Sequence, residues 1–470
     1  MSERLRRRDL ALLGAESPTT PMHNATVEIF DPGTSGFDHE ALMALIDDRI
    51  AYVPRYRQRL QFVPARLANP VWVDDPDFDL AFHVRRSALP RPGSMDQLRD
   101  LVGRIVSRPL DRHRPLWEVY FIEGLVDGRV ALLSKSHEIL VDGVETVDLG
   151  QVLLDVSPEP KDMLTDDWRP RGLPSATSLV LEAVRESIGE PRNAIRTARS
   201  NVDSALRNLP LPPSRRPVPE SPLNRELSEQ RRFVAVRTDL EDYRAVRREH
   251  GGTVNDVILA TITGALRTWL MTRGHSLGGR RSLRAVVPMS VIDDELEATS
   301  LGSQIIGHFV DLPIGEVSPV IRLHQVSYAF KAHAETGRAV AANRLAGIAG
   351  FAPTTFHALG SRVAFTQFRK GYHLSITNVP GPQFPLYAAG AEMVETYPVQ
   401  PLLAGQAMAI GVTSYDGSVF YGITADRDAL PDIEVFGSCL TEALDELVES
   451  ASSSRPRAPR GRKKPRKDDL

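Results

Sequence analysis

A proline-dense segment near the middle of the chain limits the fold more than any other feature. Six prolines fall between residues 209 and 222, in the sequence LPLPPSRRPVPESP. Because proline lacks a backbone N–H and has a fixed φ, neither a helix nor a central strand can continue through this segment. We therefore expect an extended connection between two blocks of regular structure. The length of 470 residues also exceeds what one hydrophobic core usually organises, which favours two domains.

The first block contains a predicted β-hairpin. Residues 117–125 and 129–137 are rich in β-branched and aromatic side chains, and Asp127-Gly128 between them is a strong turn signal. The hairpin brings the stretch SKSHEILVDGVE, residues 134–145, to the end of a strand. Residues 144–156 then carry apolar side chains at helical spacing. The sequence therefore places a polar His-Glu-x-x-x-Asp-Gly stretch between a strand and a helix.

The rest of the chain alternates strand and helix signals, as expected for an α/β fold. The segment TVND, residues 253–256, is a plausible cap for the long amphipathic helix expected over residues 257–270. Pro353 divides residues 339–365 into two expected buried helices, and the alternative for that stretch is a lipid-facing surface. The other expected strands are residues 232–237, 283–288, 372–378, 407–414 and 419–424, and the other expected helices are residues 178–188, 241–250 and 433–449.

These signals divide the chain into four parts. They are an N-terminal domain at residues 1–156, an interdomain helix and Pro-rich crossover at 157–231, a C-terminal domain at 232–451 and a disordered basic tail at 452–470. The tail holds eight Lys and Arg residues and has no apolar periodicity. It is either a solubilising end or a segment attracted to anionic lipid by about 1 kcal/mol per positive charge.

Composition excludes several classes of protein. A hydrophobic content of 42% with 25% charged residues is typical of a soluble globular protein, and a net charge of -3 predicts no nucleic-acid partner. The single cysteine, Cys439, excludes an internal disulfide and a thiolate zinc cluster and favours a reducing compartment. The amino terminus lacks the apolar segment of a secretory signal, and no window is long and apolar enough to span a bilayer. We expect a cytoplasmic protein with at most peripheral contact at a membrane or lipid-body surface.

Seven short motifs occur in an order that resembles one known family. They are PMH at residues 21–23, RPLWE at 114–118, KSHEILVDG at 135–143, VND at 254–256, LRAVVPMS at 283–290, DLP at 311–313 and NVPGP at 378–382. Together they resemble the bacterial, mycobacterial-type wax ester synthase/diacylglycerol acyltransferase family, over roughly residues 10–450. The resemblance implies the fold of chloramphenicol acetyltransferase and condensation domains. It predicts two α/β sandwich domains with a tunnel between them, which acyl-CoA and the alcohol enter from opposite sides.

The resemblance also assigns roles within the polar stretch. The family motif is two histidines, three variable residues and Asp-Gly, and the second histidine is the base that deprotonates the acceptor hydroxyl. On this chain His137 matches the first histidine, Glu138 occupies the catalytic position, and Asp142 and Gly143 match the Asp-Gly that orients the loop. Without the other motifs, the stretch would be interpreted as an ordinary polar turn.

Glu138 is therefore the decisive departure from the family. Histidine has a reference pKa of about 6.5 and accepts a proton unassisted, whereas glutamate, at about 4.3, needs burial to raise its pKa. A dry acyl-chain tunnel would supply such burial. His137 neighbours Glu138 on a strand end and should face the other way, so we favour Glu138 as the base.

Two further motifs are expected to support the site. Asn255 and Asp256 are interpreted either as capping residues of the helix at 257 or as a pair that faces the site across the domain boundary. Asn378, Pro380 and Gly381 are interpreted as a rigid turn near the tunnel, with the glycine free to adopt a positive φ. Ser303-Gln304 is a second departure, because relatives usually carry asparagine there.

The function implied by the resemblance is acyl transfer from acyl-CoA to 1,2-diacylglycerol, giving triacylglycerol and CoA, with long-chain alcohols as alternative acceptors. The hydroxyl attacks the thioester directly, and the chain has no Gly-x-Ser-x-Gly elbow for an acyl-enzyme. No metal or cofactor is implied, since acyl-CoA is a substrate. Glu138 keeps a second hypothesis open, namely a weakened or inactive family member that binds acyl-CoA or lipid or partners an active enzyme.

Overall fold

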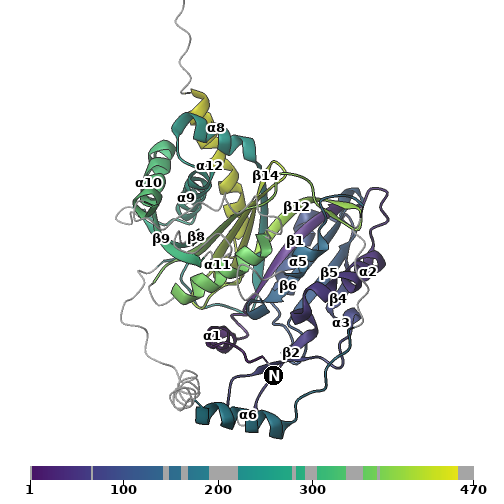
Figure 1. Ribbon diagram of the computed structural model, residues 1–470. Coiled ribbons are helices and arrows are strands. Elements are labelled where there is room, and N and C mark those ends of the chain that lie inside the picture. Colours follow the sequence, from purple (N-terminus) through teal and green to yellow (C-terminus); the bar gives the residue numbers. More distant parts are fainter. Residues whose placement is uncertain are drawn as a thin grey trace, which may run out of the picture.

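The computed structural model describes residues 3–64, 67–140, 148–159, 168–189, 221–277, 282–291, 304–334, 353–367 and 371–453. Two six-stranded sheets lie side by side with helices packed against them, which confirms the predicted α/β class (Figure 1). A small two-stranded sheet, β2 (Gln58–Gln61) and β3 (Val71–Asp74), packs with α6 (Ala176–Gly189) below the first sheet. The helix predicted at 178–188 is α6.

The first sheet contains the predicted hairpin. Its strand order is β11-β12-β1-β6-β5-β4. Asp127 and Gly128 take positive φ angles of 62° and 72°, which suits the tight turn between β5 and β6. Around the sheet lie α1 (Arg7–Ala15), α2 (His39–Arg49), α3 (Leu80–His83), α4 (Met95–Val106) and α5 (Leu149–Leu153). The strands are β1 (His23–Asp31), β4 (Val84–Ala88), β5 (Trp117–Glu123), β6 (Val130–His137), β11 (Tyr387–Ala388) and β12 (Ala391–Val399).

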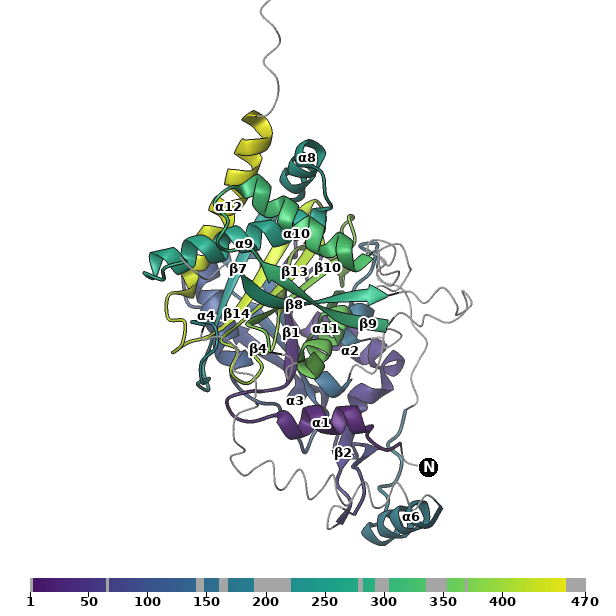
Figure 2. The ribbon, with the colours of Figure 1, turned by 90° about the vertical axis from the view of Figure 1, so that its left-hand side faces the viewer.

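The second sheet has helices on both faces. Its strand order is β7-β14-β13-β10-β8-β9. One face is covered by α8 (Leu240–His250), α9 (Val254–Thr272), α10 (Pro319–Ala334) and α12 (Ile433–Ser453), and α11 (Pro353–Gln367) lies on the other face, toward the first sheet (Figure 2). The strands are β7 (Arg231–Asp239), β8 (Leu283–Val291), β9 (Gln304–Leu312), β10 (Leu374–Pro380), β13 (Met408–Tyr415) and β14 (Ser418–Asp426).

Strand exchange joins the two halves of the chain. β11 and β12 come from residues that the sequence division places in the C-terminal domain, yet β12 pairs antiparallel with β1 in the first sheet. β12 also packs against β13 and β14 of the second sheet. The close approach depends on Gly422, because a Cβ there would lie 1.8 Å from the carbonyl oxygen of Pro398. β12 is therefore shared between both cores.

Two predictions differ from the observed local structure. Residues 378–380 are not a turn but the end of β10. Gly381, which follows them, does not have a positive φ. Pro380 is tolerated there because β10 pairs with β8 only at Leu374 and Ser375. On its β8 side, the end of β10 is therefore unpaired, and the missing N–H of proline costs no hydrogen bond there. Of the helix predicted over 144–156, the structure contains α5 and an extended Leu154, with residues 144–147 outside the described part.

Other predicted segments lie partly outside the described residues. Pro353 is the first residue of α11, as expected, but residues 335–352 are not described. Of the Pro-rich crossover only residues 221 and 222 are described, and of the basic tail only Ser452 and Ser453, which end α12. Among the described helices, none has the length and apolar character needed to cross a membrane.

We predict that Gly422→Ala destabilises the protein. The added methyl group would collide with backbone, which cannot move aside as a flexible side chain would. Overpacking of this kind typically lowers the free energy of unfolding by about 1–3 kcal/mol or more, measurable by urea denaturation. Gly14→Ala in α1 is the matched control, because a Cβ at Gly14 would meet no atom within 4 Å. Equal stability of the two variants would contradict a tight contact between β12 and β14.

Candidate active site

The polar stretch begins where β6 ends. His137 is the last residue of β6, and Glu138 opens a short 3-10 turn, η5 (Glu138–Leu140). The backbone N–H of His137 donates to the carbonyl oxygen of Leu116 at 3.0 Å, and that of Glu138 donates to Met22 at 3.0 Å. Three motif segments that are far apart in sequence, PMH, RPLWE and KSHEILVDG, therefore meet at this turn.

The carboxyl group of Glu138 is buried in the contact between the two halves of the molecule. The residue is 1% exposed. Its Oε1 accepts a hydrogen bond from Asn24 Nδ2 on β1, and its Oε2 has no hydrogen-bond partner among the described residues. Burial raises the pKa of Glu138 to about 8, although the charge of Arg362, the hydrogen bond from Asn24 and the nearby hydroxyl of Ser361 act in the opposite direction. Near neutral pH the group is therefore mostly protonated and can exchange its proton.

A small polar network holds Glu138 in place. Ser361 on α11 lies 3.1 Å from Asn24 Oδ1 and also hydrogen-bonds Gln400, which directly follows β12. Arg362 on α11 donates to the carbonyl oxygen of Glu138 at 3.2 Å and forms a buried ion pair with Asp9 of α1. Side chains from both halves of the chain therefore fix the turn. Asn24, Ser361 and Gln400 all lie outside the seven sequence motifs.

His137 points to a different set of partners. Its Nδ1 accepts from the N–H of Ile139 at 3.2 Å, and its Nε2 lies 3.6 Å from Oε2 of Glu16. Burial alone would raise the pKa of Glu16, but hydrogen bonds and charge from His137 and Arg112 lower it to about 2. His137 thus anchors the segment before β1. This placement matches the expectation that His137 and Glu138 face different ways.

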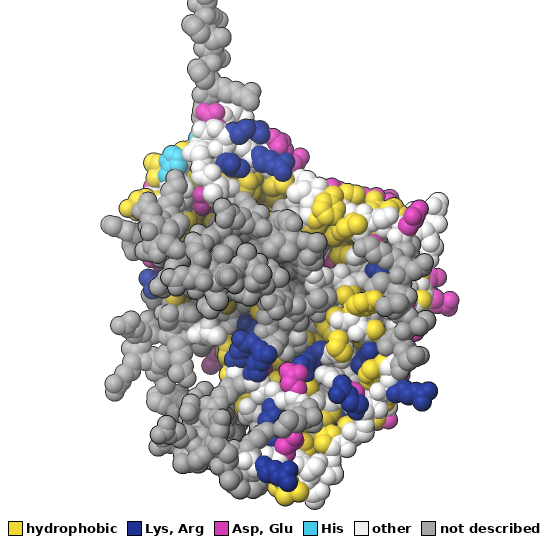
Figure 3. Space-filling view, viewed as in Figure 1, with side chains coloured by type: hydrophobic (Ala, Val, Ile, Leu, Met, Phe, Trp, Pro, Cys, Tyr) yellow, Lys and Arg dark blue, Asp and Glu magenta, His cyan; other side chains and the backbone are white. Residues whose placement is uncertain are grey.

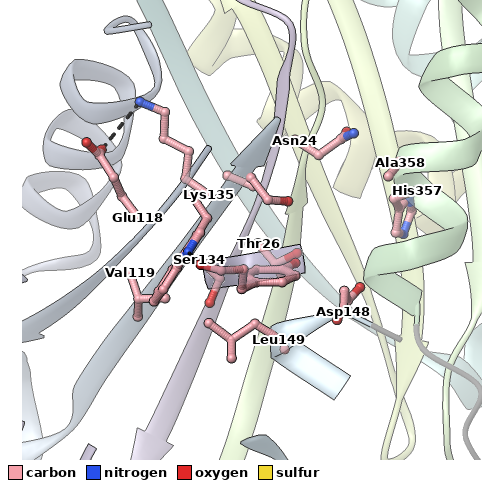
Figure 4. A pocket seen from close by; sticks show the side chains of 15 residues that line it. Asn24, Thr26, Glu118, Val119, Ser134, Lys135, Asp148, Leu149, His357 and Ala358 are labelled. Carbon is pink, nitrogen blue, oxygen red and sulfur yellow. Dashed lines mark hydrogen bonds and ion pairs between the residues drawn. The ribbon is translucent and has the colours of Figure 1, made fainter. Parts of the chain in front are cut away.

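A small cavity of about 30 Å³ lies beside this network, against one face of the first sheet. It is lined by Asn24 and Thr26 of β1, side chains of β5 and β6, Asp148 and Leu149 at α5, and His357 of α11 (Figure 4). Asn24 and Thr26 share this face because alternate residues of a strand point the same way. Glu138 does not line the cavity itself but is joined to it through Asn24.

The remaining predicted site residues lie elsewhere. Asp142 and Gly143 are outside the described residues. Asp256 forms a capping box with Thr253, since its carboxylate accepts from the Thr253 N–H at 2.8 Å. Asn255 Oδ1 accepts from Asn378 Nδ2 at 2.8 Å, so two of the motifs do meet. The two motifs meet at the start of α9. Asn378 lies on one face of β10, and its neighbour Thr377 lies on the opposite face, where it contacts α11.

Ser303 is outside the described residues, and Gln304 begins β9. Pro380 ends β10, and the Gly381 N–H donates to Ser414 at 2.9 Å. Among the described residues, no three His, Cys, Asp or Glu side chains gather as a metal site would require.

Comparison with known proteins identifies the family. Residues 5–258 match the wax ester synthase/diacylglycerol acyltransferase catalytic domain, and residues 301–448 match the C-terminal domain of the same family. The chain belongs to this family. The strand at Glu138 and the helix α11 that covers it come from the two matched regions, so the site combines both family domains.

Relatives within the family include two proteins of Mycobacterium tuberculosis. The probable diacylglycerol O-acyltransferase Tgs3 is 39% identical over 263 residues, 53% of this chain and 97% of that protein. The probable diacylglycerol O-acyltransferase Tgs1 is 32% identical over 417 residues, 87% of this chain and 88% of that protein.

Solved structures agree with the fold. The wax ester synthase/diacylglycerol acyltransferase from Marinobacter aquaeolei VT8 matches with a TM-score of 0.66 at 27% identity, over 96% of this chain and 100% of that chain. The first condensation domain of the calcium-dependent antibiotic synthetase matches with a TM-score of 0.55 at 14% identity, over 96% of this chain and 97% of that domain. This second likeness concerns the fold alone, and it confirms the predicted condensation-domain type of architecture.

We predict that Glu138→Gln stabilises this family member in a pH-dependent way. The unfolded chain ionises Glu138 near 4.5, whereas the folded chain retains the proton until about pH 8. Between these values the wild type loses stability as pH rises, because only the unfolded state has released its proton. Glutamine removes this loss. The stabilisation should be small below pH 4.5, grow to several kcal/mol near pH 8, and stay constant above, since one pKa unit corresponds to about 1.4 kcal/mol.

Urea denaturation of wild type and Glu138→Gln between pH 4.5 and 9 tests this prediction. Glu229→Gln provides a control at an exposed loop carboxylate and should show no pH-dependent difference from wild type. A constant difference between wild type and Glu138→Gln across the whole range would contradict the raised pKa.

Proposed function

We propose that this protein is an acyl-CoA-dependent O-acyltransferase of neutral-lipid synthesis that converts 1,2-diacylglycerol to triacylglycerol. Long-chain alcohols are the alternative acceptors and would give wax esters. Membership of the family and the names of the mycobacterial relatives support this class of reaction. The observation that carries the proposal is the buried carboxyl of Glu138, whose Oε2 has no partner among the described residues and whose Oε1 is joined through Asn24 to a cavity formed by both halves of the chain.

In the proposed reaction Glu138 is the general base. Ionised Glu138 accepts the proton of the acceptor hydroxyl on Oε2, while Asn24 continues to hold Oε1. The hydroxyl oxygen then attacks the carbonyl carbon of the thioester, the carbon–sulfur bond breaks, and the CoA thiolate leaves with the proton that Glu138 returns. A pKa of about 8 places the base close to the pH at which it works. No acyl-enzyme and no cofactor are required, because acyl-CoA itself supplies the activated acyl group.

A weakened or inactive family member that binds acyl-CoA or lipid is the second candidate. The observation in its favour is that Glu138 reaches the cavity only through Asn24. In that case Glu138 would have only a structural role, as one member of the hydrogen-bonded network with Asn24 and Ser361. The two candidates differ in whether turnover exists and whether it depends on Glu138.

We predict that wild type forms triacylglycerol from labelled oleoyl-CoA and diacylglycerol, and that Glu138→Ala and Glu138→Gln lose about 10²–10⁴-fold of this activity. The wild-type rate should rise with pH and level off above about pH 8, because only ionised Glu138 accepts a proton. Product no higher than in a boiled control would favour the binding protein. Equal rates for wild type and Glu138→Gln would exclude Glu138 as the base.

We predict a gain of turnover for Glu138→His below pH 8. A buried histidine is neutral at pH 7 and accepts a proton at once, whereas most Glu138 carboxyls must first ionise. The gain should be largest near pH 6.5–7 and shrink toward pH 8 and above. Paired measurement of kcat for both proteins across this range tests it. A lower rate for Glu138→His at every pH would mean that the surroundings of residue 138 are specific for a carboxyl group.

We further propose a cytoplasmic protein that contacts a membrane or lipid droplet peripherally through its basic tail, residues 452–470. On the part of the face that Figure 3 colours, Lys and Arg side chains lie among hydrophobic groups and some Asp and Glu. The eight positive charges of the tail supply the attraction to anionic lipid in this proposal. Truncation after Ser452 should reduce binding to vesicles that contain anionic lipid and leave turnover of dispersed substrate unchanged. Equal vesicle binding by both chains would remove the tail from the proposal.

A further inference from the structure

His357 is a buried side chain that the reaction described above does not use. It lies on α11, is 3% exposed, and lines the same cavity as Asn24 and Thr26 (Figure 4). It precedes Ser361 by four residues on the helix, so both side chains are on the same face, about 6 Å apart along the axis. Its Nε2 is buried and has no hydrogen-bond partner among the described residues. An unpaired ring nitrogen at a substrate cavity indicates a ligand-facing role.

The other ring nitrogen determines which one carries the proton. Nδ1 lies 2.8 Å from the hydroxyl oxygen of Thr377 on β10, which is 3% exposed. This hydroxyl has no second hydrogen-bond partner in the described part of the chain. If Nδ1 donated, both the hydroxyl hydrogen of Thr377 and the lone pair on Nε2 would be buried without a partner, whereas donation by Thr377 leaves only the Nε2–H unpaired. Thr377 therefore donates to Nδ1, and the proton of the neutral ring is on Nε2, toward the cavity.

The ring also stays neutral. Burial lowers the pKa of His357 to about 3, so the imidazole does not become charged at any pH at which the protein would work. Of the two described acidic residues at the cavity, Asp148 caps α5 by accepting from the Gln151 N–H at 2.8 Å. The other, Glu118, pairs with Arg85 and Lys135. A neutral imidazole with its proton on Nε2 is a hydrogen-bond donor and not a base.

We propose that His357 is a further catalytic residue, whose Nε2–H donates to the thioester carbonyl oxygen and stabilises the negative charge that forms there during attack. The inference rests on the proposed acyltransferase function and assigns a second group to it. Asn24, which holds Glu138, lines the cavity from the first sheet, and His357 lines it from α11. The acceptor loses its proton on one side while the carbonyl oxygen gains negative charge on the other. A donor fixed by packing and by Thr377 needs no reorganisation when that charge appears.

Steady-state kinetics of His357→Ala test the proposal. Loss of one donor to such an oxygen typically lowers kcat by about 10²–10³-fold. The KM for acyl-CoA should change little, because the stabilised charge exists only in the transition state. His357→Ala should also keep the wild-type rise of rate with pH, since that rise belongs to Glu138. An unchanged kcat, or a loss confined to KM, would overturn the role of His357.

Thr377→Val provides a second variant that leaves His357 in place. Without the hydroxyl, the ring is free to place its proton on either nitrogen, and kcat should fall, by less than in His357→Ala. Thr413→Val is the matched control, because Thr413 is a buried threonine of the neighbouring strand β13 that donates to the Val379 carbonyl oxygen instead. It should retain the wild-type kcat. Equal rates in the two threonine variants would contradict a role for Thr377 in orienting the proton.

Nitrogen-15 NMR of histidine-labelled protein tests the proton position without substrate. Comparison with His357→Gln assigns the His357 signals, which should show a neutral ring protonated on Nε2 from pH 6 to 8. A ring protonated on Nδ1, or a charged ring, would overturn the inference whatever the turnover. If wild type itself makes no product, the proposed function fails; if wild type is active and His357→Ala equals it, only the present inference fails.

Discussion

The pairing of β12 with β1 is the interaction on which the site depends. It takes a strand from the C-terminal half of the chain into the N-terminal sheet, and Gln400 follows directly at its end. Gln400 and Ser361 of α11 are thereby brought to Asn24, whose amide holds Glu138. Without this strand exchange, the turn at Glu138 would lie at the edge of one domain. With it, the turn is covered by α11 and removed from water, which sets its electrostatics.

Burial at this turn has a free-energy cost that the protein only partly offsets. A fully paired buried carboxylate, such as Glu16 beside His137 and Arg112, has a lowered pKa and remains charged. Glu138 has one donor on Oε1 and none on Oε2, and its pKa is raised instead. Both groups lie at the end of β6, where Glu16 contacts His137 and Glu138 is the next residue, yet one anchors the fold and the other retains chemical freedom. An unsatisfied buried oxygen is unfavourable for stability and useful for proton transfer.

Much of the local structure could be predicted from the sequence, because it is determined by local patterns. The Asp127-Gly128 turn fixes the β5–β6 hairpin, and the Thr253–Asp256 capping box begins α9, as spacing and turn chemistry predict. The family motifs also led to Glu138 and to the α/β fold. The membership of β11 and β12 in the first sheet could not be predicted, because strand pairing across the chain depends on tertiary contacts rather than on periodicity.

The partners of Glu138 could not be predicted for the same reason. Ser361 and His357 lie on one face of α11 in a stretch that is otherwise apolar, and nothing in their spacing indicates which sheet that face will meet. Asn24 offered a weak signal. With Thr26 and Glu28 it forms a polar row at alternate positions of a buried strand, which is unusual for a core strand and marks a face that meets a polar site.

Both groups that face the proposed reaction are neutral at rest, and this accounts for a glutamate at a position that is histidine in the family. A low-polarity site favours the uncharged form of either side chain. The difference appears only when a proton must be accepted, because neutral histidine has a free lone pair and a protonated carboxyl must first ionise. With a pKa of about 8 for Glu138, ionisation at pH 7 costs about 1.4 kcal/mol, or a factor of ten in the active form. That penalty is smaller than the typical gain from a general base, about 10²–10⁴-fold, so with Glu138 as the proposed base we expect the exchange to reduce catalysis without abolishing it.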